Sequence, residues 1–158
     1  NDYTVSKRML SSFVSSYKHD FTHWHFYIPT IYGAGENPKR LIPYVINAIR
    51  NGEELHFTAG DQTRQYVHVS EVPRMLAQAF DKNLPSGLYN IQGKETVTVK
   101  EIVTEIHHAM GKEVPDGCFG SVQRADVGMK YLALDGKKLH DATGFEASIK
   151  ITDVIDTY

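Results

Sequence analysis

The amino-acid sequence of 158 residues predicts an α/β fold. Stretches whose apolar residues recur every three or four positions, as in amphipathic helices, alternate with short stretches rich in aromatic and β-branched residues, as in strands. Alternation of this kind favours helices packed on a sheet that contains parallel strands. Two closely spaced short strands and a long irregular stretch over residues 111–130 indicate that the sheet is not a complete doubly wound one.

The first half of the chain alternates helices with strands. In order, we expect a helix over residues 2–17, a buried strand over 25–32, a loop over 33–39, a helix from Leu41 to a stop at Asn51–Gly52, and short strands over 54–59 and 64–69. Apolar spacing indicates the helices, and aromatic and β-branched residues indicate the strands. Two glycines and a proline indicate the loop.

The second half is less regular. In order, we expect a helix from a cap at Ser70 to about Phe80, a strand over 88–91, a helix from Thr98 to Met110, the irregular stretch over 111–130, and helical segments over 135–142 and 152–158. Ser and Thr are favoured caps because their hydroxyl oxygens accept hydrogen bonds from the first turn of a helix. Glu101, three residues after Thr98, completes a capping-box pattern.

Composition narrows the function classes. The formal charge of -2 and the pI near 6.5 give no electrostatic basis for a nucleic-acid or anionic-membrane partner. No apolar run approaches the roughly 18 residues of a membrane span. The single cysteine, Cys118, cannot form an internal disulfide, so we expect a cytoplasmic protein. The eight histidines lack metal-site spacing, so no metal is expected.

The first chemical motif lies at the start of the chain. Tyr3 and Lys7 are four residues apart on the expected first helix, so their side chains share one face. A phenol is a poor base at neutral pH, but a nearby ammonium group stabilises its phenolate form. Such a pair can take a proton from a substrate hydroxyl or return one to a ketone. Alone, the pattern also fits the start of an ordinary surface helix.

Further blocks follow this pair in a fixed order. They are IPTIYGAGENPKRLIP at residues 28–43, GDQTRQYVHVSEV at 60–72, QRADV at 123–127 and LDGKKLHDATGF at 134–145. Together with the Tyr-x-x-x-Lys pair, they resemble the extended short-chain dehydrogenase/reductase family, specifically its NAD(P)-dependent nucleotide-sugar epimerase/dehydratase branch. The resemblance covers essentially the whole chain.

This resemblance implies the C-terminal part of a Rossmann-type fold, with a catalytic helix, one parallel strand and a small mixed α/β substrate domain. Residues 1–35 are expected to be the tail of the NAD(P)-binding Rossmann domain, and residues 36–158 the nucleotide-sugar-binding domain. The family's glycine-rich dinucleotide loop and catalytic Ser or Thr precede the Tyr-x-x-x-Lys helix. Because the chain starts at Asn1 without them, we expect the N-terminal cofactor domain to be missing and the fragment to be inactive by itself.

The resemblance also implies roles around the reacting centre. Tyr3 is expected to be the general acid/base, and Lys7 to tune it and to bond the cofactor ribose. Ile28 and Pro29 fall where the family's strand end passes the nicotinamide, and Thr30 falls where relatives bond the sugar or its diphosphate. Ordinary packing at the end of a strand is the alternative for Ile28, Pro29 and Thr30.

At the nucleotide end, Arg40 and Leu41 match the segment that flanks the base, and Phe57 lies on the strand that lines it. Core packing is the alternative for Leu41 and Phe57. Arg64 and Arg124 match arginines that bond the diphosphate, where a planar guanidinium can contact two oxygens at once.

At three positions the sequence does not decide how the substrate site is built. Asp126 matches a ribose contact but fits a turn cap equally well. Gln65 replaces the usual Asp beside the first phosphate-binding arginine, and Ala125 breaks the usual Pro-Gly after the second. The sequence therefore does not decide which neighbouring residues hold the guanidinium groups of the two arginines in place.

The implied function is hydride transfer to or from NAD or NADP on a nucleoside-diphosphate sugar, as an epimerase, dehydratase or reductase. In the intact protein, a second copy is the expected partner, packed through the Tyr-x-x-x-Lys helix. A ketone reductase of the same superfamily that acts on a non-sugar substrate is one alternative. A non-catalytic NAD-sensing or interaction protein with the same fold is the other.

Overall fold

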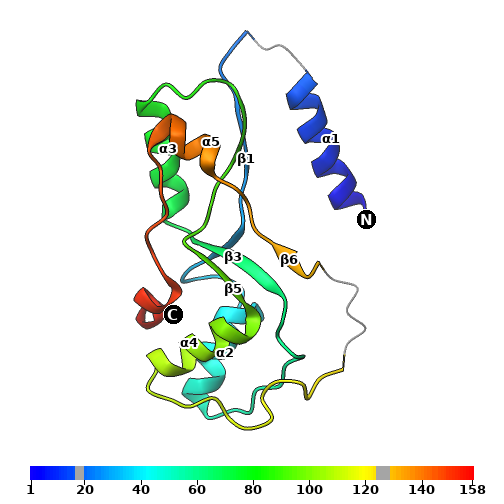
Figure 1. The fold of residues 1–158 in the computed structure, drawn as a ribbon, viewed down its shortest axis with the longest axis vertical. Coiled ribbons are helices and arrows are strands. Elements are labelled where there is room, and N and C mark those ends of the chain that lie inside the picture. The colour runs from blue at the N-terminus through cyan, green and yellow to red at the C-terminus, as the bar shows by residue number, and fades with distance from the viewer. Residues whose placement is uncertain (17–19, 124–128) are drawn as a thin grey trace.

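The computed structural model describes residues 1–16, 20–123 and 129–158, and it shows an elongated molecule (Figure 1). Four residues named above lie outside the described residues. They are Tyr17 of the first predicted helix and Arg124, Ala125 and Asp126 of the predicted phosphate and ribose contacts.

Helices and parallel strands occur together, which confirms the predicted α/β fold. The α-helices are α1 (Asp2–Ser16), α2 (Leu41–Asn51), α3 (Glu71–Asp81), α4 (Val99–Ala109) and α5 (Lys137–Thr143). The strands are β1 (Trp24–Tyr27), β2 (Thr30–Tyr32), β3 (Thr63–His68), β4 (Gly87–Asn90), β5 (Glu95–Thr98) and β6 (Tyr131–Leu132). Two 3-10 helices, Ile151–Asp153 and Ile155–Thr157, follow α5.

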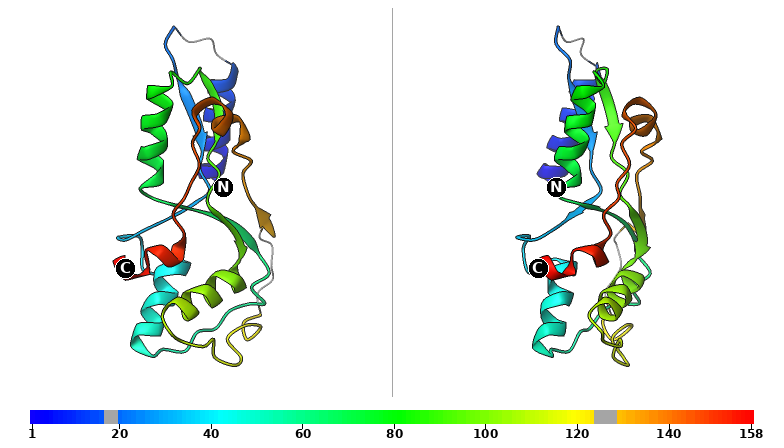
Figure 2. Two further views of the ribbon diagram at one scale, coloured as in Figure 1. Left: turned by 60° about the vertical axis from the view of Figure 1, so that its left-hand side comes forward. Right: turned by 90° about the vertical axis from the view of Figure 1, so that its left-hand side faces the viewer.

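The strands form two sheets. β1 and β4 pair in parallel, with Trp24 opposite Gly87. In the second sheet, β3 pairs in parallel with β2 and with β6, and antiparallel with β5. Helices α3 and α5 lie at the end of the molecule that holds β1 and β4, whereas α2 and α4 lie at the other end (Figures 1 and 2).

Each end has its own hydrophobic cluster. The cluster at the α2/α4 end includes the fully buried Val45, Ile46, Ile102 and Ile106. The cluster at the other end includes Met75, Leu84, Tyr89, Ile91 and Leu139. Burying a large aliphatic or aromatic side chain contributes about 1.5–3 kcal/mol each, so both ends are stabilised mainly by apolar packing.

The single strand predicted over residues 25–32 is wrong. β1 ends at Tyr27 and β2 begins at Thr30, and the two strands belong to different sheets. Pro29 lies between them, and a proline has no N–H to continue a ladder of hydrogen bonds. β1 is also only partly buried. The break directs the chain from one sheet to the other at the residues predicted to face the nicotinamide and the sugar.

Other predicted elements are wrong in segments whose sequence shows no regular apolar pattern. The strand over residues 54–59 is absent, and only Phe57 forms an isolated bridge there, to Phe119. The predicted helix over 152–158 is two 3-10 turns. β5 and β6 were not predicted, because four and two residues are too few to show alternation.

The two predicted helix caps differ in outcome. Thr98 forms the expected capping box, in which its hydroxyl oxygen accepts a hydrogen bond from the Glu101 N–H at 3.0 Å. The Ser70 cap is wrong, because that hydroxyl bonds Nδ1 of His68 at 2.8 Å and makes no bond to the helix. Competition from a nearby imidazole is not visible in a capping pattern.

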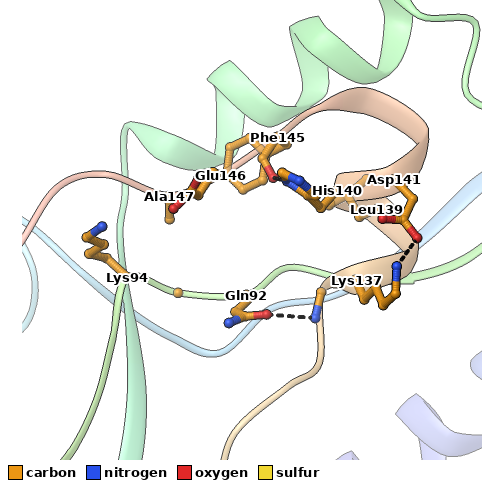
Figure 3. A pocket seen from close by; sticks show the side chains of 11 residues that line it. Gln92, Lys94, Lys137, Leu139, His140, Asp141, Phe145, Glu146 and Ala147 are labelled. Atoms are coloured by element: carbon orange, nitrogen blue, oxygen red, sulfur yellow. Dashed lines mark hydrogen bonds and ion pairs between the residues drawn. The ribbon is translucent and has the colours of Figure 1, made fainter.

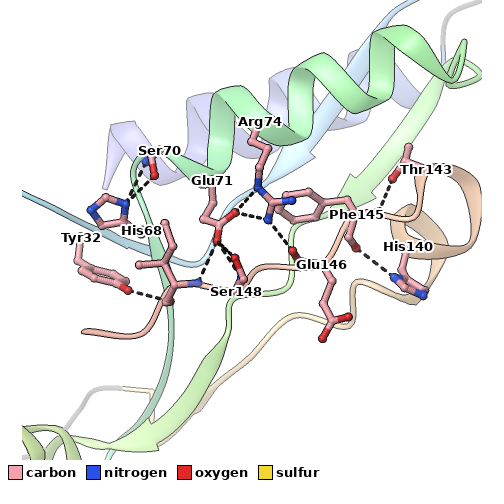
Figure 4. Close-up of polar contacts among 11 residues, drawn as sticks. Tyr32, His68, Ser70, Glu71, Arg74, His140, Thr143, Phe145, Glu146 and Ser148 are labelled. Carbon is pink, nitrogen blue, oxygen red and sulfur yellow. Dashed lines mark hydrogen bonds and ion pairs between the residues drawn. The ribbon is translucent and has the colours of Figure 1, made fainter. Parts of the chain in front are cut away.

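A C-terminal strap, residues 145–158, runs from α5 to the α2/α4 end and is held by a buried carboxylate (Figures 1 and 4). Oε1 of Glu71 accepts hydrogen bonds from the backbone N–H groups of Ser148 and Ile149 at 2.8 and 3.0 Å. Oε2 of Glu71 accepts from Nε of Arg74 at 2.7 Å. Glu71 is 1% exposed, so one carboxylate joins α3 to the strap inside the protein.

These contacts set the protonation of Glu71. Burial acts to raise the pKa of its carboxyl, but the hydrogen bonds from Ser148, Arg74 and Ile149 outweigh burial and leave the pKa below its usual value. A carboxyl whose pKa is lowered on folding stabilises the folded state at pH values above its unfolded pKa, near 4.5. That contribution is lost as the pH falls through the lower, folded-state pKa.

We therefore expect Glu71→Gln to lower the free energy of unfolding by about 2–3 kcal/mol at pH 7, because an amide leaves one buried contact mismatched. The difference from the parent protein should shrink as the pH falls from about 5 to about 3. Urea unfolding across this range measures it. Glu146→Gln is the matched control, since Glu146 is exposed and uses only its backbone carbonyl, toward Arg74. Parent-like stability of Glu71→Gln at pH 7 would contradict this account of the strap.

Candidate substrate and catalytic site

The Tyr3–Lys7 pair lies at the exposed start of α1. Oδ1 of Asn1 accepts a hydrogen bond from the Thr4 N–H at 3.0 Å and so begins the helix. Nζ of Lys7 lies 5.5 Å from the centroid of the Tyr3 ring, as expected for residues one turn apart. The Tyr3 side chain is 70% exposed, so its hydroxyl is open to a ligand.

Helix α1 makes little contact with the rest of the described chain. None of its residues is buried, and the apolar side chains of Met9, Leu10 and Phe13 are exposed. The Ser11 hydroxyl bonds Nε2 of His25 at 3.0 Å and so joins α1 to β1. The N-terminal end of α1 is directed toward the level of β3 and β6 in every view (Figures 1 and 2).

Four predicted substrate residues come together in one cleft of about 260 Å³. Thr30 enters it from β2, Arg40 and Leu41 from the start of α2, and Arg64 from β3. Glu36, Ile42, Tyr66 and Val99 complete the lining. Residues from two strands and a helix start therefore converge at one end of the second sheet.

Two cationic side chains and a tyrosine line the cleft together. Burial raises the pKa of Tyr66 to about 12, while the charges of Arg64 and Arg40 act in the opposite direction. The Tyr66 hydroxyl therefore stays protonated at neutral pH. Arg64 donates one hydrogen bond, to the Thr63 carbonyl at 2.7 Å, and no carboxylate among the described residues pairs with it. Such a cleft can donate hydrogen bonds to an anion.

The remaining predicted site residues lie elsewhere. Ile28 is exposed and Pro29 buried in the connection between β1 and β2. Phe57 does not line the cleft; its ring stacks on Phe119 with centroids 5.8 Å apart and meets the edge of Tyr44 at 6.2 Å. These aromatic rings pack beside the hydrophobic cluster of α2 and α4.

Gln65 has a role of its own that the sequence left undecided. Its amide donates to the Thr96 hydroxyl and to the Leu134 carbonyl, both at 3.2 Å, and its Oε1 accepts from the Leu134 N–H at 3.2 Å. The side chain is buried and points away from supporting the neighbouring arginine, because its hydrogen bonds join β3 to β5 and to the segment before α5.

The sequence did not single out Glu36 or Tyr66. Tyr66 lies two residues after Arg64 on β3, so period-two alternation places both side chains on one face of that strand. Glu36 precedes Arg40 by four residues in a loop, where that spacing carries no meaning by itself.

A separate cavity of about 410 Å³ lies between residues 92–94 and α5 (Figure 3). Lys94, Lys137 and His140 contribute its basic groups, and Asp141 and Glu146 its acidic ones. None of the predicted site residues lines it. Among the described residues, no cluster of His, Cys, Asp or Glu could hold a metal ion. In residues 1–16, 20–123 and 129–158, no helix has the length and apolar composition needed to cross a bilayer.

Comparison with known proteins places this geometry in context. The model of the NAD dependent epimerase/dehydratase family matches residues 1–91. CDP-abequose synthase of Salmonella muenchen is 26% identical over 87 residues, 52% of this chain and 30% of that protein. The dTDP-glucose 4,6-dehydratase of Streptomyces griseus is 26% identical over 127 residues, 77% of this chain and 37% of that protein. The chain thus spans about a third of the length of these relatives.

A solved structure shares the fold. MoeE5, in complex with UDP-glucuronic acid and NAD, superposes with a TM-score of 0.73 at 24% identity, covering 98% of this chain and 51% of MoeE5.

Proposed function

This chain belongs to the NAD-dependent epimerase/dehydratase family, and we propose that it supplies the substrate cleft and the catalytic tyrosine of an enzyme that acts on a nucleoside-diphosphate sugar. The observation that carries the proposal is the cleft that Arg40, Arg64, Thr30 and Tyr66 line together. Both curated relatives are named for nucleotide-sugar chemistry, and MoeE5 was solved with UDP-glucuronic acid and NAD. The family match confirms the resemblance drawn from the motifs.

The cleft suits a diphosphate because its donors are fixed before a ligand arrives. Arg64 carries a guanidinium on a strand, which is a rigid support, and among the described residues no carboxylate forms an ion pair with it. Thr30 and Tyr66 add hydroxyl groups. We propose that Arg124 adds a further guanidinium and Asp126 a ribose contact. Binding the constant nucleotide half of the substrate would position the sugar at the reacting centre.

The reacting centre we propose is Tyr3. The chemistry that NAD or NADP would supply, when bound, is a hydride acceptor for the sugar carbon that is oxidised. Tyr3 takes the proton of the hydroxyl on that carbon, so that a ketone forms, and it returns the proton in the reverse step. Lys7 would stabilise the phenolate form of Tyr3 that accepts this proton, since its ammonium group is one helical turn away.

The described residues fit part of a nicotinamide cofactor. No carboxylate among the described residues forms an ion pair with Lys7, and we propose that its ammonium group donates hydrogen bonds to the ribose hydroxyls. Ile28 offers an exposed apolar side chain for the nicotinamide, next to Pro29. The 158 residues contain no glycine-rich dinucleotide loop, so we propose that residues 1–35 contribute to a cofactor site that this chain does not complete, and that residues 36–158 bind the substrate.

The exposed apolar face of α1 supports a further part of the proposal. Met9 and Phe13, one helical turn apart, are 67% and 58% exposed, and contiguous exposed apolar side chains often mark a protein–protein contact. We propose that in the intact protein this face packs against the same helix of a second copy.

We expect Arg64→Ala to weaken binding of UDP or dTDP by about 30- to 100-fold, because charge-assisted hydrogen bonds to a phosphate contribute about 2–3 kcal/mol. Calorimetric titration of the complete gene product measures this. Lys82→Ala, an exposed cation at the end of α3, is the control and should bind like the parent protein. Unchanged nucleotide affinity in Arg64→Ala, with turnover of a non-sugar ketone, would support the ketone reductase instead.

A further inference from the structure

Among the described residues, one acidic side chain lines the substrate cleft, although the proposed ligand of the cleft is an anion. Glu36 lines the cleft beside Arg40, and its Oε2 lies 3.2 Å from Nε of that arginine. A carboxylate in a diphosphate site repels the ligand unless its charge is compensated. The position of the Glu36 carboxylate in this cleft therefore needs a physical explanation.

The carboxylate of Glu36 is held on both oxygens. Oε1 accepts a hydrogen bond from the Tyr158 hydroxyl at 2.7 Å and a longer one from the Gly33 N–H at 3.4 Å, while Oε2 faces Arg40. The Glu36 side chain is 11% exposed, whereas that of Arg40 is 48% exposed. The buried partner is thus fixed, and the open partner is the one that reaches the cleft.

Tyr158 comes from the far end of the C-terminal strap. Its hydroxyl is a donor at neutral pH, because burial and the hydrogen bond to Glu36 both raise its pKa. Its carbonyl accepts a hydrogen bond from Nη1 of Arg50 on α2 at 2.5 Å, and its ring packs on the hydrophobic cluster of α2 and α4. The tyrosine is therefore anchored independently of the carboxylate that it contacts.

We propose that Glu36 is a positioning residue: held by Tyr158, it orients the guanidinium of Arg40 so that its remaining N–H groups face the diphosphate of the substrate. This inference rests on the proposed function. An arginine side chain loses considerable rotamer freedom when it binds a ligand, so a partner that orders it beforehand raises affinity. The charge of Arg40 balances that of Glu36, which removes the repulsion as long as both are present.

The test is a double-mutant cycle on the complete gene product, with affinity for UDP and dTDP measured by calorimetry. Glu36→Gln keeps the shape of the side chain and removes its charge. In the native background we expect it to weaken binding about 5-fold. In an Arg40→Met background we expect the same change to strengthen binding about 2-fold, because an uncompensated carboxylate is then removed. This reversal of sign supports a positioning role.

Two other patterns overturn the inference. Equal weakening in both backgrounds would mean that Glu36 acts only on the structure of the loop. Strengthening in both backgrounds would mean that it only repels the ligand. If Arg64→Ala weakens nucleotide binding while Glu36→Gln shows either pattern, the proposed function stands and this inference fails. If the unaltered protein binds none of UDP, dTDP, CDP and GDP, the proposed function and the inference fail together.

Tyr158→Phe provides a second variant that keeps the ring in the core and removes only the hydroxyl. We expect it to weaken nucleotide binding about 2- to 3-fold, and to have no effect when Glu36 is already Gln. Tyr131→Phe, at an exposed tyrosine on β6, is the control and should bind like the parent protein. An equal effect of Tyr158→Phe with and without the Glu36 carboxylate would contradict the proposed link.

Discussion

Replacing Tyr3 by phenylalanine should lower turnover of the nucleotide sugar by about 1,000-fold, because proton transfer by a positioned side chain contributes about 10²- to 10⁴-fold to a rate. The substitution removes one oxygen from an exposed ring and leaves the helix intact. Screening UDP-, dTDP-, CDP- and GDP-sugars with NAD and NADP identifies the substrate on the parent protein, and the variant is then compared on that substrate.

The effect should fall on the chemical step alone. Tyr3 lies on α1, whereas the cleft that binds the nucleotide is built from β2, α2 and β3. Affinity for UDP or dTDP should therefore stay within about twofold of the parent value in Tyr3→Phe. A loss of rate together with a loss of nucleotide affinity would point to damage beyond the hydroxyl group.

Tyr131→Phe is the matched control for this substitution as well, since Tyr131 is 64% exposed and lies on β6 rather than on α1. It should turn over at the parent rate. If Tyr3→Phe kept a rate within about tenfold of the parent protein, the tyrosine would not be the general acid/base. Another group would then move the proton, whereas absence of turnover by the parent protein with every sugar tested would support the non-catalytic alternative.

Long periodic segments were predictable from the sequence, whereas short or interrupted ones were not. α2 and α4 bury one face over eleven residues each, and their apolar spacing indicates this directly. The break between β1 and β2 was signalled by Pro29, but the run of aromatic and β-branched residues around it outweighed that signal. β6 has two residues and exists only through pairing with β3, which no local pattern records.

In the candidate site too, some residues were predictable from the sequence and others were not. Thr30, Arg40, Leu41 and Arg64 were assigned from ordered motifs, and the structure brings them to one cleft. Glu36 could not be assigned, because its contact to the Tyr158 hydroxyl joins residues 122 positions apart. Such a pair has no spacing to recognise, and only folding of the strap makes it adjacent.

Gly93→Ala should destabilise the protein by about 3 kcal/mol or more and lower its Tm by about 10 °C. A β-carbon at position 93 would lie 2.0 Å from the carbonyl oxygen of Tyr66 and 2.6 Å from its carbonyl carbon, far inside ordinary contact. Both atoms belong to the backbone of β3, which is paired with three other strands and cannot give way as a side chain would. Thermal and urea unfolding measure the loss.

Gly93→Ala should also disturb the substrate cleft, because Tyr66 and Arg64 of β3 both line it. Nucleotide affinity of the folded fraction should fall about tenfold at a temperature well below the Tm.

Gly87→Ala separates the clash at position 93 from the general effect of adding a methyl group to a strand. Position 87 also has no positive φ, and its new β-carbon would meet neighbours at 3.4 Å or more, which is ordinary contact. The free energy of unfolding of Gly87→Ala should therefore stay within about 1 kcal/mol of the parent value. Equal stability of Gly93→Ala and Gly87→Ala would show that β3 can move without cost, contrary to its central place in the second sheet.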